Sequence, residues 1–269
     1  MLGDARRSVS GAQRVELREL ARRAGLLDRA GRLCRSRLWK RRLRGARVYT
    51  LLGGGEEDVP TLFDDRRAEV RSEAAVWASE HPERRIVDRL LELLGDDATL
   101  CRFTVKDSLL RLGPPVVEPL RSFLVTARGR RAAAGLEVAA ALGDPRLLGA
   151  GFRLLEDGDA ATRRRAIDLL GALGGEQAGA ALVAGLRDPA PDVRAAAARA
   201  LGHGHHWSAS GSLATAMRDD DWAVRHAAGM ALRRLDAPGE LLLLRMRGDE
   251  DGFARDMARL MLEVPGSAA

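Results

Sequence analysis

The chain repeats one pattern of apolar and charged positions about every 31 residues. In each full copy an Asp stands six residues before an Arg, and small or apolar residues follow the Arg by three and by seven positions. Those two positions lie on one side of an α-helix, so the pattern predicts a helix with a buried stripe. One copy, around Ala132, keeps the apolar positions without the charged pair. The pairs are Asp65 and Arg71, Asp96 and Arg102, Asp157 and Arg163, Asp188 and Arg194, Asp219 and Arg225, and Asp249 and Arg255.

Each copy predicts two helices joined by the turn that carries the Asp, followed by a turn rich in Gly, Pro or Asp. A helix pair of this length cannot bury its apolar face alone, so successive pairs must stack. We expect the Asp and Arg side chains to link adjacent turns in an Asp–Arg ladder, which is structural rather than catalytic. The sequence therefore predicts an all-α fold, an α-solenoid built as a right-handed superhelix of antiparallel helix pairs.

Two segments resemble a known repeat family. DPAPDVRAAAARALG (Asp188–Gly202) and DDDWAVRHAAGMAL (Asp219–Leu232) are similar to the bacterial HEAT repeat, in the short form named after the phycobiliprotein (PBS) lyases. The resemblance covers roughly residues 60–264. It implies that the Arg-bearing helix of each pair lines the concave face of the solenoid. It implies little about function, because such repeats occur in scaffolds, adaptors, enzyme subunits and some catalysts.

The N-terminal part departs from the regular repeat. Residues 14–30 predict one amphipathic helix, and residues 36–53 can be laid over a degenerate repeat with Arg42 in the position of the Arg. A degenerate copy is typical of a terminal cap, because one of its faces has no neighbour to match. We therefore expect a basic helical cap over 1–53, a flexible connection at Gly53–Thr61, a repeat array over 54–264 and a disordered tail over 265–269.

Charge is distributed unevenly. The formal net charge is +6, but residues 1–50 carry +11 and the remainder carries −5. The cap could bind an acidic protein or a membrane surface. A nucleic-acid partner is not expected, because only 4% of residues are aromatic and no helix-turn-helix or zinc-finger motif is present. The alternative is a solvated cap with Trp39 and Tyr49 in its core. The candidate basic patch is Arg35, Arg37, Lys40, Arg41, Arg42, Arg44 and Arg47.

Four of the five histidines are candidates for a metal site: His203, His205, His206 and His226. The turn that holds the first three contains no Cys, Asp or Glu, and the fourth lies at the start of its own helix, the opposite end from that turn. We therefore expect a polar turn, no metal and no cofactor. The two cysteines, Cys34 and Cys101, form no CxxC motif, and no signal peptide or apolar span is visible, which indicates a cytoplasmic protein.

No motif predicts catalysis. The iron-binding HEAT-repeat hydroxylase is recognised by His-Glu pairs, and this chain has no His-Glu dipeptide. A glycosylase-like groove could use Trp77 and Asp107, and a bilin-lyase-like role is not distinguished from a scaffold. There is no GxSxG motif, P-loop or dinucleotide fingerprint. We therefore expect a non-enzymatic protein.

The remaining candidate site is the concave face that the resemblance implies. Five residues after each Arg the same helix face carries a position that a partner could contact, and the series has an acidic centre and a more basic C-terminal part. Such a strip could hold an extended basic peptide or a partner helix. We expect a scaffold or adaptor with a protein partner; the alternatives are solvated positions, a lyase-like or glycosylase-like enzyme, or a peripheral membrane adaptor. The candidate residues are Val76, Asp107, Glu137, Asp168, Arg199 and Met230, with Arg111 and Arg234 nearby.

Overall fold

The computed structural model describes residues 11–263, and within that range it contains helices and no strand. The all-α solenoid expected from the repeat pattern is confirmed. The chain divides into two compact units, Met1–Phe123 (unit 1) and Leu124–Ala269 (unit 2), which are described separately below. The tail predicted over 265–269 lies outside the described residues.

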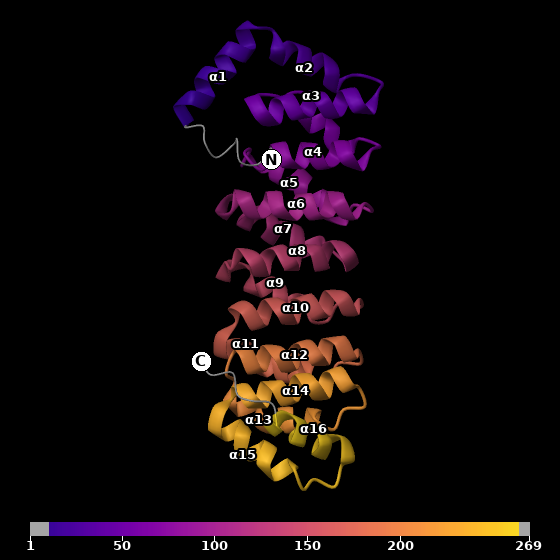
Figure 1. The fold of residues 1–269 in the computed structure, drawn as a ribbon, viewed down its shortest axis with the longest axis vertical. Helices are drawn as coiled ribbons and strands as arrows, with labels where there is room; N and C mark the ends of the chain where they lie inside the picture. The colour runs from indigo at the N-terminus through magenta and orange to yellow at the C-terminus, as the bar shows by residue number, and fades with distance from the viewer. Residues whose placement is uncertain (1–10, 264–269) are drawn as a thin grey trace. The chain divides into compact units, whose positions relative to one another are not determined.

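Unit 1 contains the N-terminal helices and the first regular repeats (Figure 1). The longer helices α3, α4 and α6 lie side by side, each packed against the next, and shorter helices connect them. Helix α7 contains the division between the units. The elements are α1 (Gly11–Arg23), α2 (Leu26–Cys34), α3 (Trp39–Leu52), the 3-10 helix η1 (Val59–Asp64), α4 (Ala68–Ala78), α5 (Arg84–Glu92), η2 (Leu93–Gly95), α6 (Thr99–Leu112), η3 (Pro114–Val116) and α7 (Val117–Thr126).

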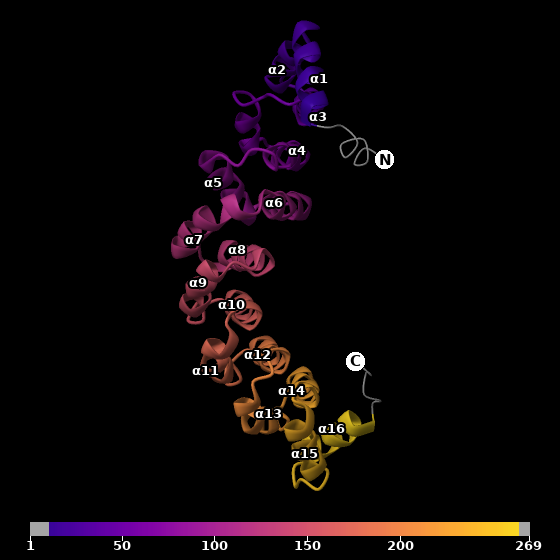
Figure 2. The same cartoon turned by 90° about the vertical axis from the view of Figure 1, so that its left-hand side faces the viewer.

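Unit 2 has two layers of helices. Figure 2 shows it as a curved stack whose inner side is formed by α8 and by the Arg-bearing helices α10, α12, α14 and α16 and whose outer side is formed by α9, α11, α13 and α15. The elements are α8 (Gly129–Leu142), η4 (Pro145–Leu147), α9 (Leu148–Leu154), α10 (Ala160–Leu173), α11 (Gly175–Gly185), α12 (Pro191–His203), η5 (Trp207–Ala209), α13 (Ser210–Ala216), α14 (Trp222–Arg234), α15 (Asp236–Met246) and α16 (Gly252–Glu263).

Small residues set the spacing between neighbouring helices in unit 2. The alanines three residues after each Arg, including Ala166, Ala197 and Ala228, are fully buried. A Cβ on Gly202 of α12 would lie 2.6 Å from the Cα of Ala231 on α14, so these two helices touch along their backbones. This contact distance explains why the repeat places Ala or Gly where other helix pairs place larger residues.

The single helix predicted over residues 14–30 is wrong, because the chain forms two helices there. Gly25 separates α1 from α2 with a φ of +67°, a conformation that favours glycine and ends the first helix. The α1 part of the apolar side predicted for this helix is largely solvent-exposed: Val15 is 70% exposed, Leu17 43% and Leu20 63%. Helix α1 therefore contributes little to the core of unit 1.

The connection expected to be flexible is instead held to the repeats. The Trp77 indole Nε1 donates a 2.7 Å hydrogen bond to the Gly54 carbonyl, and the 3-10 helix η1 begins at Val59. The Tyr49 hydroxyl lies 2.7 Å from Oδ2 of Asp58. These contacts join the cap to the array within unit 1. None of the described helices is long and apolar enough to cross a bilayer.

Candidate functional site

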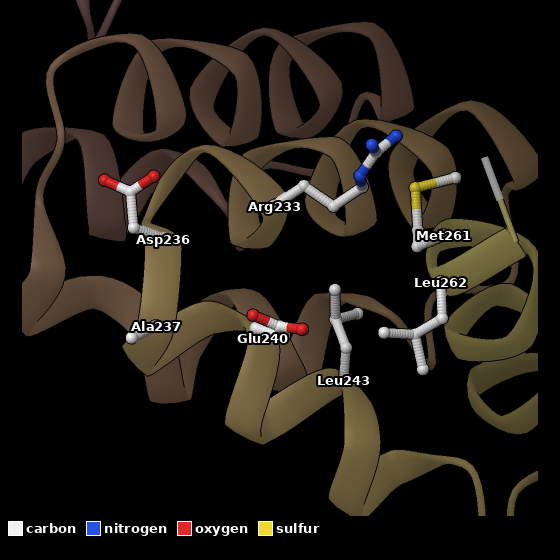
Figure 3. A pocket seen from close by; sticks show the side chains of 7 residues that line it. All are labelled: Arg233, Asp236, Ala237, Glu240, Leu243, Met261 and Leu262. Carbon is white, nitrogen blue, oxygen red and sulfur yellow. The ribbon is translucent and has the colours of Figure 1, made fainter. Parts of the chain in front are cut away.

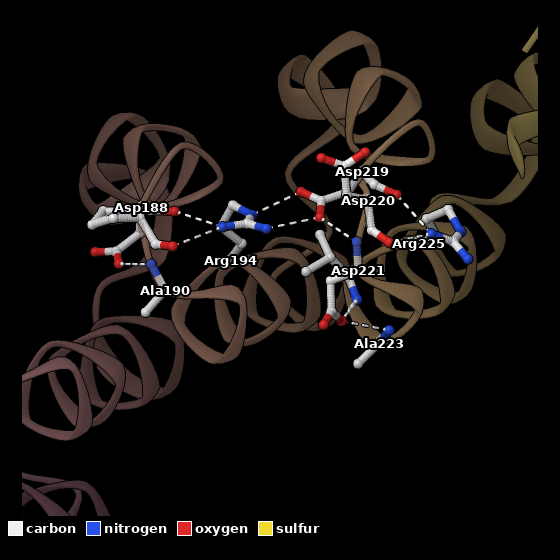
Figure 4. A network of polar contacts seen from close by, with 10 residues as sticks. Asp188, Ala190, Arg194, Asp219, Asp220, Asp221, Ala223 and Arg225 are labelled. Atoms are coloured by element: carbon white, nitrogen blue, oxygen red, sulfur yellow. Dashed lines mark hydrogen bonds and ion pairs between the residues drawn. The ribbon is translucent and has the colours of Figure 1, made fainter.

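Each rung of the ladder joins an Arg to two successive turns. The Arg194 guanidinium donates to Oδ2 and Oδ1 of Asp219 at 2.7 and 2.8 Å, and its other terminal nitrogen donates to the Asp188 carbonyl at 2.9 Å (Figure 4). The sequence left open which carboxylate the guanidinium would reach. In this rung it reaches the carboxylate of the following repeat and the backbone of its own.

The Asp of each rung also shapes the start of its helix. Asp219 Oδ1 accepts a 2.9 Å hydrogen bond from the backbone N–H of Asp221, the residue that caps α14. Burial would raise the pKa of Asp219, but the Arg194 fork and this N–H together hold it below its ordinary value. The Arg163 fork has the same effect on Asp188 and lowers the pKa of that carboxyl. The rungs are therefore ion pairs at neutral pH.

The same fork recurs in three further places, including one in the degenerate repeat. Arg42, which lacks an Asp six residues earlier, still donates to a carboxylate in the next turn and to the carbonyl of Ser36. The side chains in these pairs are largely buried. The pairs are Arg42 with Asp65, Arg71 with Asp96, and Arg163 with Asp188.

Three arginines of the predicted ladder receive no carboxylate among the described residues. Arg102 and Arg255 donate only to oxygens of their own repeat, and these include the backbone carbonyls of Asp96 and Asp249. The Arg225 guanidinium lies 4.3 Å from the centre of the Phe253 ring, and Asp249 pairs with Arg218 instead.

Ala132 occupies the position of the arginine that would reach Asp157, and Oδ1 of Asp157 accepts from the backbone N–H of Asp159 as in the complete rungs. The ladder is thus a set of separate rungs.

The candidate binding face is divided between the two units. In unit 1, Val76 is half-buried on α4, and Asp107 and Arg111 form an exposed pair on α6 with 3.7 Å between their charged atoms. The other five candidates lie on the inner helices α8, α10, α12 and α14 of unit 2. They are Glu137, Asp168, Arg199, Met230 and Arg234.

The acidic centre expected for this face is partly offset by Arg165, a residue outside the candidate positions. Arg165 lies 3.3 Å from Oδ2 of Asp168 and 3.7 Å from Oε2 of Glu137. Its position three residues before Asp168 on one helix was the signal that could have revealed it. In unit 2 the acidic part of the row is therefore occupied by a partner from the same molecule.

Positive charge dominates the other part of the row. Burial lowers the pKa of His203, and the nearby Arg234 and Arg199 guanidinium groups lower it further. His203 and Arg199 are exposed, while Arg234 and Met230 are half-buried. The lowered pKa leaves His203 neutral at pH 7, so the positive charge comes from Arg199 and Arg234. Arg199, His203 and Arg234, called the basic end below, thus form a surface with two cations beside an apolar side chain.

The seven-residue basic patch of the N-terminal region is reduced to four cations. Arg35, Arg42 and Arg47 pair with Asp58, Asp65 and Glu73, carboxylates that the sequence analysis had not matched to them. The remaining four are exposed and have no described carboxylate within ion-pair distance. They are Arg37, Lys40, Arg41 and Arg44.

The residues weighed for chemistry do not converge. Trp77 is 3% exposed and bonded to backbone, so it cannot face a substrate beside Asp107. His226 stacks on Trp222 with 4.9 Å between ring centres. Within residues 11–263, no group of three or more His, Cys, Asp or Glu side chains is placed to hold a metal ion.

A hollow between α14, α15 and α16 lies at the C-terminal end of unit 2 (Figure 3). The carboxylates of Asp236 and Glu240 lie on α15, and Met261 and Leu262 approach from α16. Arg233 reaches into the same region from α14. This arrangement puts charges beside apolar side chains and contains no nucleophile with a neighbouring base.

Comparisons with known proteins agree with the repeat pattern. A family model described as HEAT repeats matches residues 179–263. No curated protein matches the chain. Among solved structures, the chain is similar to Kap95 in its complex with Nup1, with 14% identity, coverage of 89% of this chain and 42% of Kap95, and a TM-score of 0.60. A structure of Kap95p with RanGDP gives 13% identity, coverage of 93% and 44%, and a TM-score of 0.61. These likenesses show the solenoid fold.

A third likeness is more distant in shape. Human deoxyhypusine hydroxylase in complex with glycerol is 21% identical, with coverage of 88% of this chain and 94% of that chain and a TM-score of 0.37.

Proposed function

We propose that this HEAT-repeat protein is a non-enzymatic scaffold that holds a protein partner on the inner helices of unit 2. One observation supports the proposal above all: equivalent positions on α12 and α14 bring Arg199, His203 and Arg234 together beside the half-buried Met230. A cationic surface with an apolar neighbour suits a partner that offers carboxylates next to an apolar side chain.

The charge of this row favours an acidic partner over the basic peptide that the sequence suggested. Arg165 already pairs with Asp168 and lies near Glu137, so a basic peptide would have to displace it. The basic end has no such internal partner among the described carboxylates. Exposed cations of this kind chiefly affect the association rate and the choice of partner.

Further features support a scaffold in the cytoplasm. The polar residues of the inner face are spread over four helices and no two form a nucleophile and base. Kap95, whose fold the chain shares, was solved in complex with the protein Nup1. Both described cysteines are free and buried, as expected for a protein of a reducing compartment.

The test compares two double variants of equal charge. Arg199→Ala with Arg234→Ala removes the basic end, whereas Arg187→Ala with Arg247→Ala removes two exposed cations at the ends of the outer helices α11 and α15. Proteins captured by the native chain are identified by quantitative mass spectrometry and then tested for direct binding as purified proteins. A partner lost only from the first variant supports the proposal. A partner that binds both variants equally contacts another surface, and this outcome contradicts it.

A second candidate function is attachment to an anionic membrane. It is favoured by the four exposed cations of the N-terminal patch and by Leu38, which is 57% exposed beside them. Each surface cation contributes about 1 kcal/mol near an anionic bilayer, and salt weakens the attraction. We expect the chain to sediment with phosphatidylserine vesicles at low salt and the variant with all four changed to Ala to stay in solution. Equal sedimentation with phosphatidylcholine vesicles would rule out this attachment.

A further inference from the structure

Unit 1 contains a pocket outside the row of inner helices. It has a volume of about 540 Å³ and lies between α1, α2, the end of α3 and the connection over residues 54–58. Charged side chains line its walls, and the buried Tyr49 also borders it. The charged lining residues are Arg18, Asp28, Arg32, Arg35, Glu56, Glu57 and Asp58.

Asp58 is the buried group in this pocket, with 9% of its surface exposed. Its Oδ2 lies 2.7 Å from the Tyr49 hydroxyl, and a Cβ on Gly31 would lie 2.7 Å from the same oxygen. The lack of a side chain at residue 31 is therefore what makes room for the carboxylate against α2. Its negative charge also acts on its neighbours: burial raises the pKa of the Cys34 thiol to about 12, and the Asp58 charge contributes to this rise.

The other oxygen of Asp58 has an ion-pair partner but no hydrogen bond. Oδ1 is buried, and Nη2 of Arg35 lies 2.8 Å away without hydrogen-bond geometry. The Arg35 side chain is 72% exposed, so its guanidinium covers the carboxylate from the solvent side. A buried carboxylate is costly unless it is well paired, and here its cation is held by a single contact.

We propose that this pocket binds an arginine side chain of a partner polypeptide, whose guanidinium replaces that of Arg35 on Asp58. A planar guanidinium can donate to Oδ1 of Asp58 and to a second carboxylate of the wall together, which an ammonium group does with poorer geometry. The chain pairs guanidinium forks with carboxylates in the same way at four ladder rungs, Arg194 with Asp219 among them. The inference goes beyond the proposed scaffold function and does not rest on it, because the inner helices of unit 2 take no part.

The exchange leaves the net charge of the pocket unchanged. The pocket wall holds four carboxylates and three arginines. When Arg35 moves away, four carboxylates face the two guanidinium groups of Arg18 and Arg32, and one of these, Arg18, already pairs with Glu56 at 3.0 Å. An arriving cation therefore restores the balance that the departure of Arg35 removes.

The experiment is calorimetric titration of the full chain with the peptide acetyl-Gly-Arg-Gly-amide, and with the same peptide carrying neutral citrulline. We expect saturable binding of the arginine peptide and at least about tenfold weaker binding of the citrulline peptide. Arg35→Ala removes the internal competitor and should tighten binding about threefold or more. Arg37→Ala is the matched control, since it removes an exposed cation two residues away that is not part of the pocket lining, and it should change affinity less than twofold.

Asp58→Asn should weaken binding about tenfold or more, with an unchanged circular dichroism spectrum. If this variant does not fold, the comparison of Arg35→Ala with Arg37→Ala still decides the matter. Equal tightening by both variants would mean that general charge, rather than Asp58, attracts the peptide, and would overturn the proposal. Equal binding of the citrulline peptide, or no saturable binding, would also overturn it. None of these outcomes bears on the basic end of unit 2, so the two proposals fail separately.

Discussion

Removal of one guanidinium fork tests the energetic role of the ladder. Arg194→Ala deletes two charge-assisted hydrogen bonds to Asp219 and one to the Asp188 carbonyl. The side chains of Arg194 and Asp219 are 18% and 13% exposed, so the pair is mostly but not fully buried. A hydrogen bond to a charged group contributes about 1.5–3 kcal/mol, and removal of one partner from a fully buried pair costs about 3–5 kcal/mol.

The expected loss of unfolding free energy lies at the junction of these ranges, at about 2–3 kcal/mol. It does not reach the upper end because Asp219 keeps the N–H of Asp221. Arg194→Lys keeps the charge and loses the fork, so we expect about 1–2 kcal/mol. Arg255→Ala is the matched control: this arginine occupies the same position in its repeat but donates only to carbonyls, which predicts about 1 kcal/mol.

The assay is urea unfolding followed by circular dichroism, with the midpoint and the slope fitted separately. With a slope of about 2–3 kcal/mol per molar urea, Arg194→Ala should lower the midpoint by about 1 M. The difference from the native chain should be full above the unfolded pKa of Asp, about 3.9, and should shrink as the pH falls toward the lowered folded pKa of Asp219. Equal midpoints for Arg194→Ala and Arg255→Ala would refute the reasoning, because the carboxylate fork would then contribute nothing.

Three further outcomes are expected. Ala197→Leu should lower the unfolding free energy by about 1–3 kcal/mol in the urea assay, because Ala197 is fully buried between helices. Ala172→Leu, at an exposed position, should leave it unchanged. Equal effects of the two variants would contradict the burial of Ala197 between helices. Stability of the native chain should decline below about pH 4. Several aspartates that receive a fork have pKa values lower in the folded than in the unfolded chain, so unfolding takes up protons as the pH falls; a urea midpoint constant down to pH 3 would refute this. Burial raises the pKa of Cys34 to about 12 and that of Cys101 to about 11, so the folded chain at pH 8 should resist iodoacetamide until urea is added; rapid labelling in buffer would contradict it.

The repeat could be read from the sequence because each of its positions has one physical requirement. Ala166, Ala197 and Ala228 must be small where helices touch, and the spacing of Asp and Arg must match one turn and one helical step. The solenoid follows from such local rules repeated along the chain. The helix break at Gly25 and the hydrogen bond from Trp77 to the Gly54 carbonyl could not be predicted in this way, since each is a single local feature that does not recur in the other repeats.

The candidate site was less accessible to prediction than the fold. The register of the repeat gives the turn that carries each Asp and the helix that carries each Arg. It does not give the ion-pair partner of each side chain, which depends on how far that side chain extends. Arg225 lies over Phe253 while Arg218 takes Asp249, although both arginines are near the same turn. The pocket that contains Asp58 is lined by residues from four segments of unit 1, and no sequence motif predicts it.

The rungs have a direction along the chain. In every complete rung the guanidinium comes from the earlier repeat and the carboxylate from the later one, as in Arg163 with Asp188. A repeat that loses its predecessor keeps a desolvated carboxylate without its cation, whereas a repeat that loses its successor keeps an arginine bonded to its own turn, as Arg255 is. Because a ribosome delivers the earlier repeat first, each new turn emerges with its arginine already available. Assembly of each unit from its N-terminal repeat thus gives every carboxylate its arginine at once. Unfolding that starts at the N-terminal repeat instead leaves the carboxylate of the next repeat without its arginine.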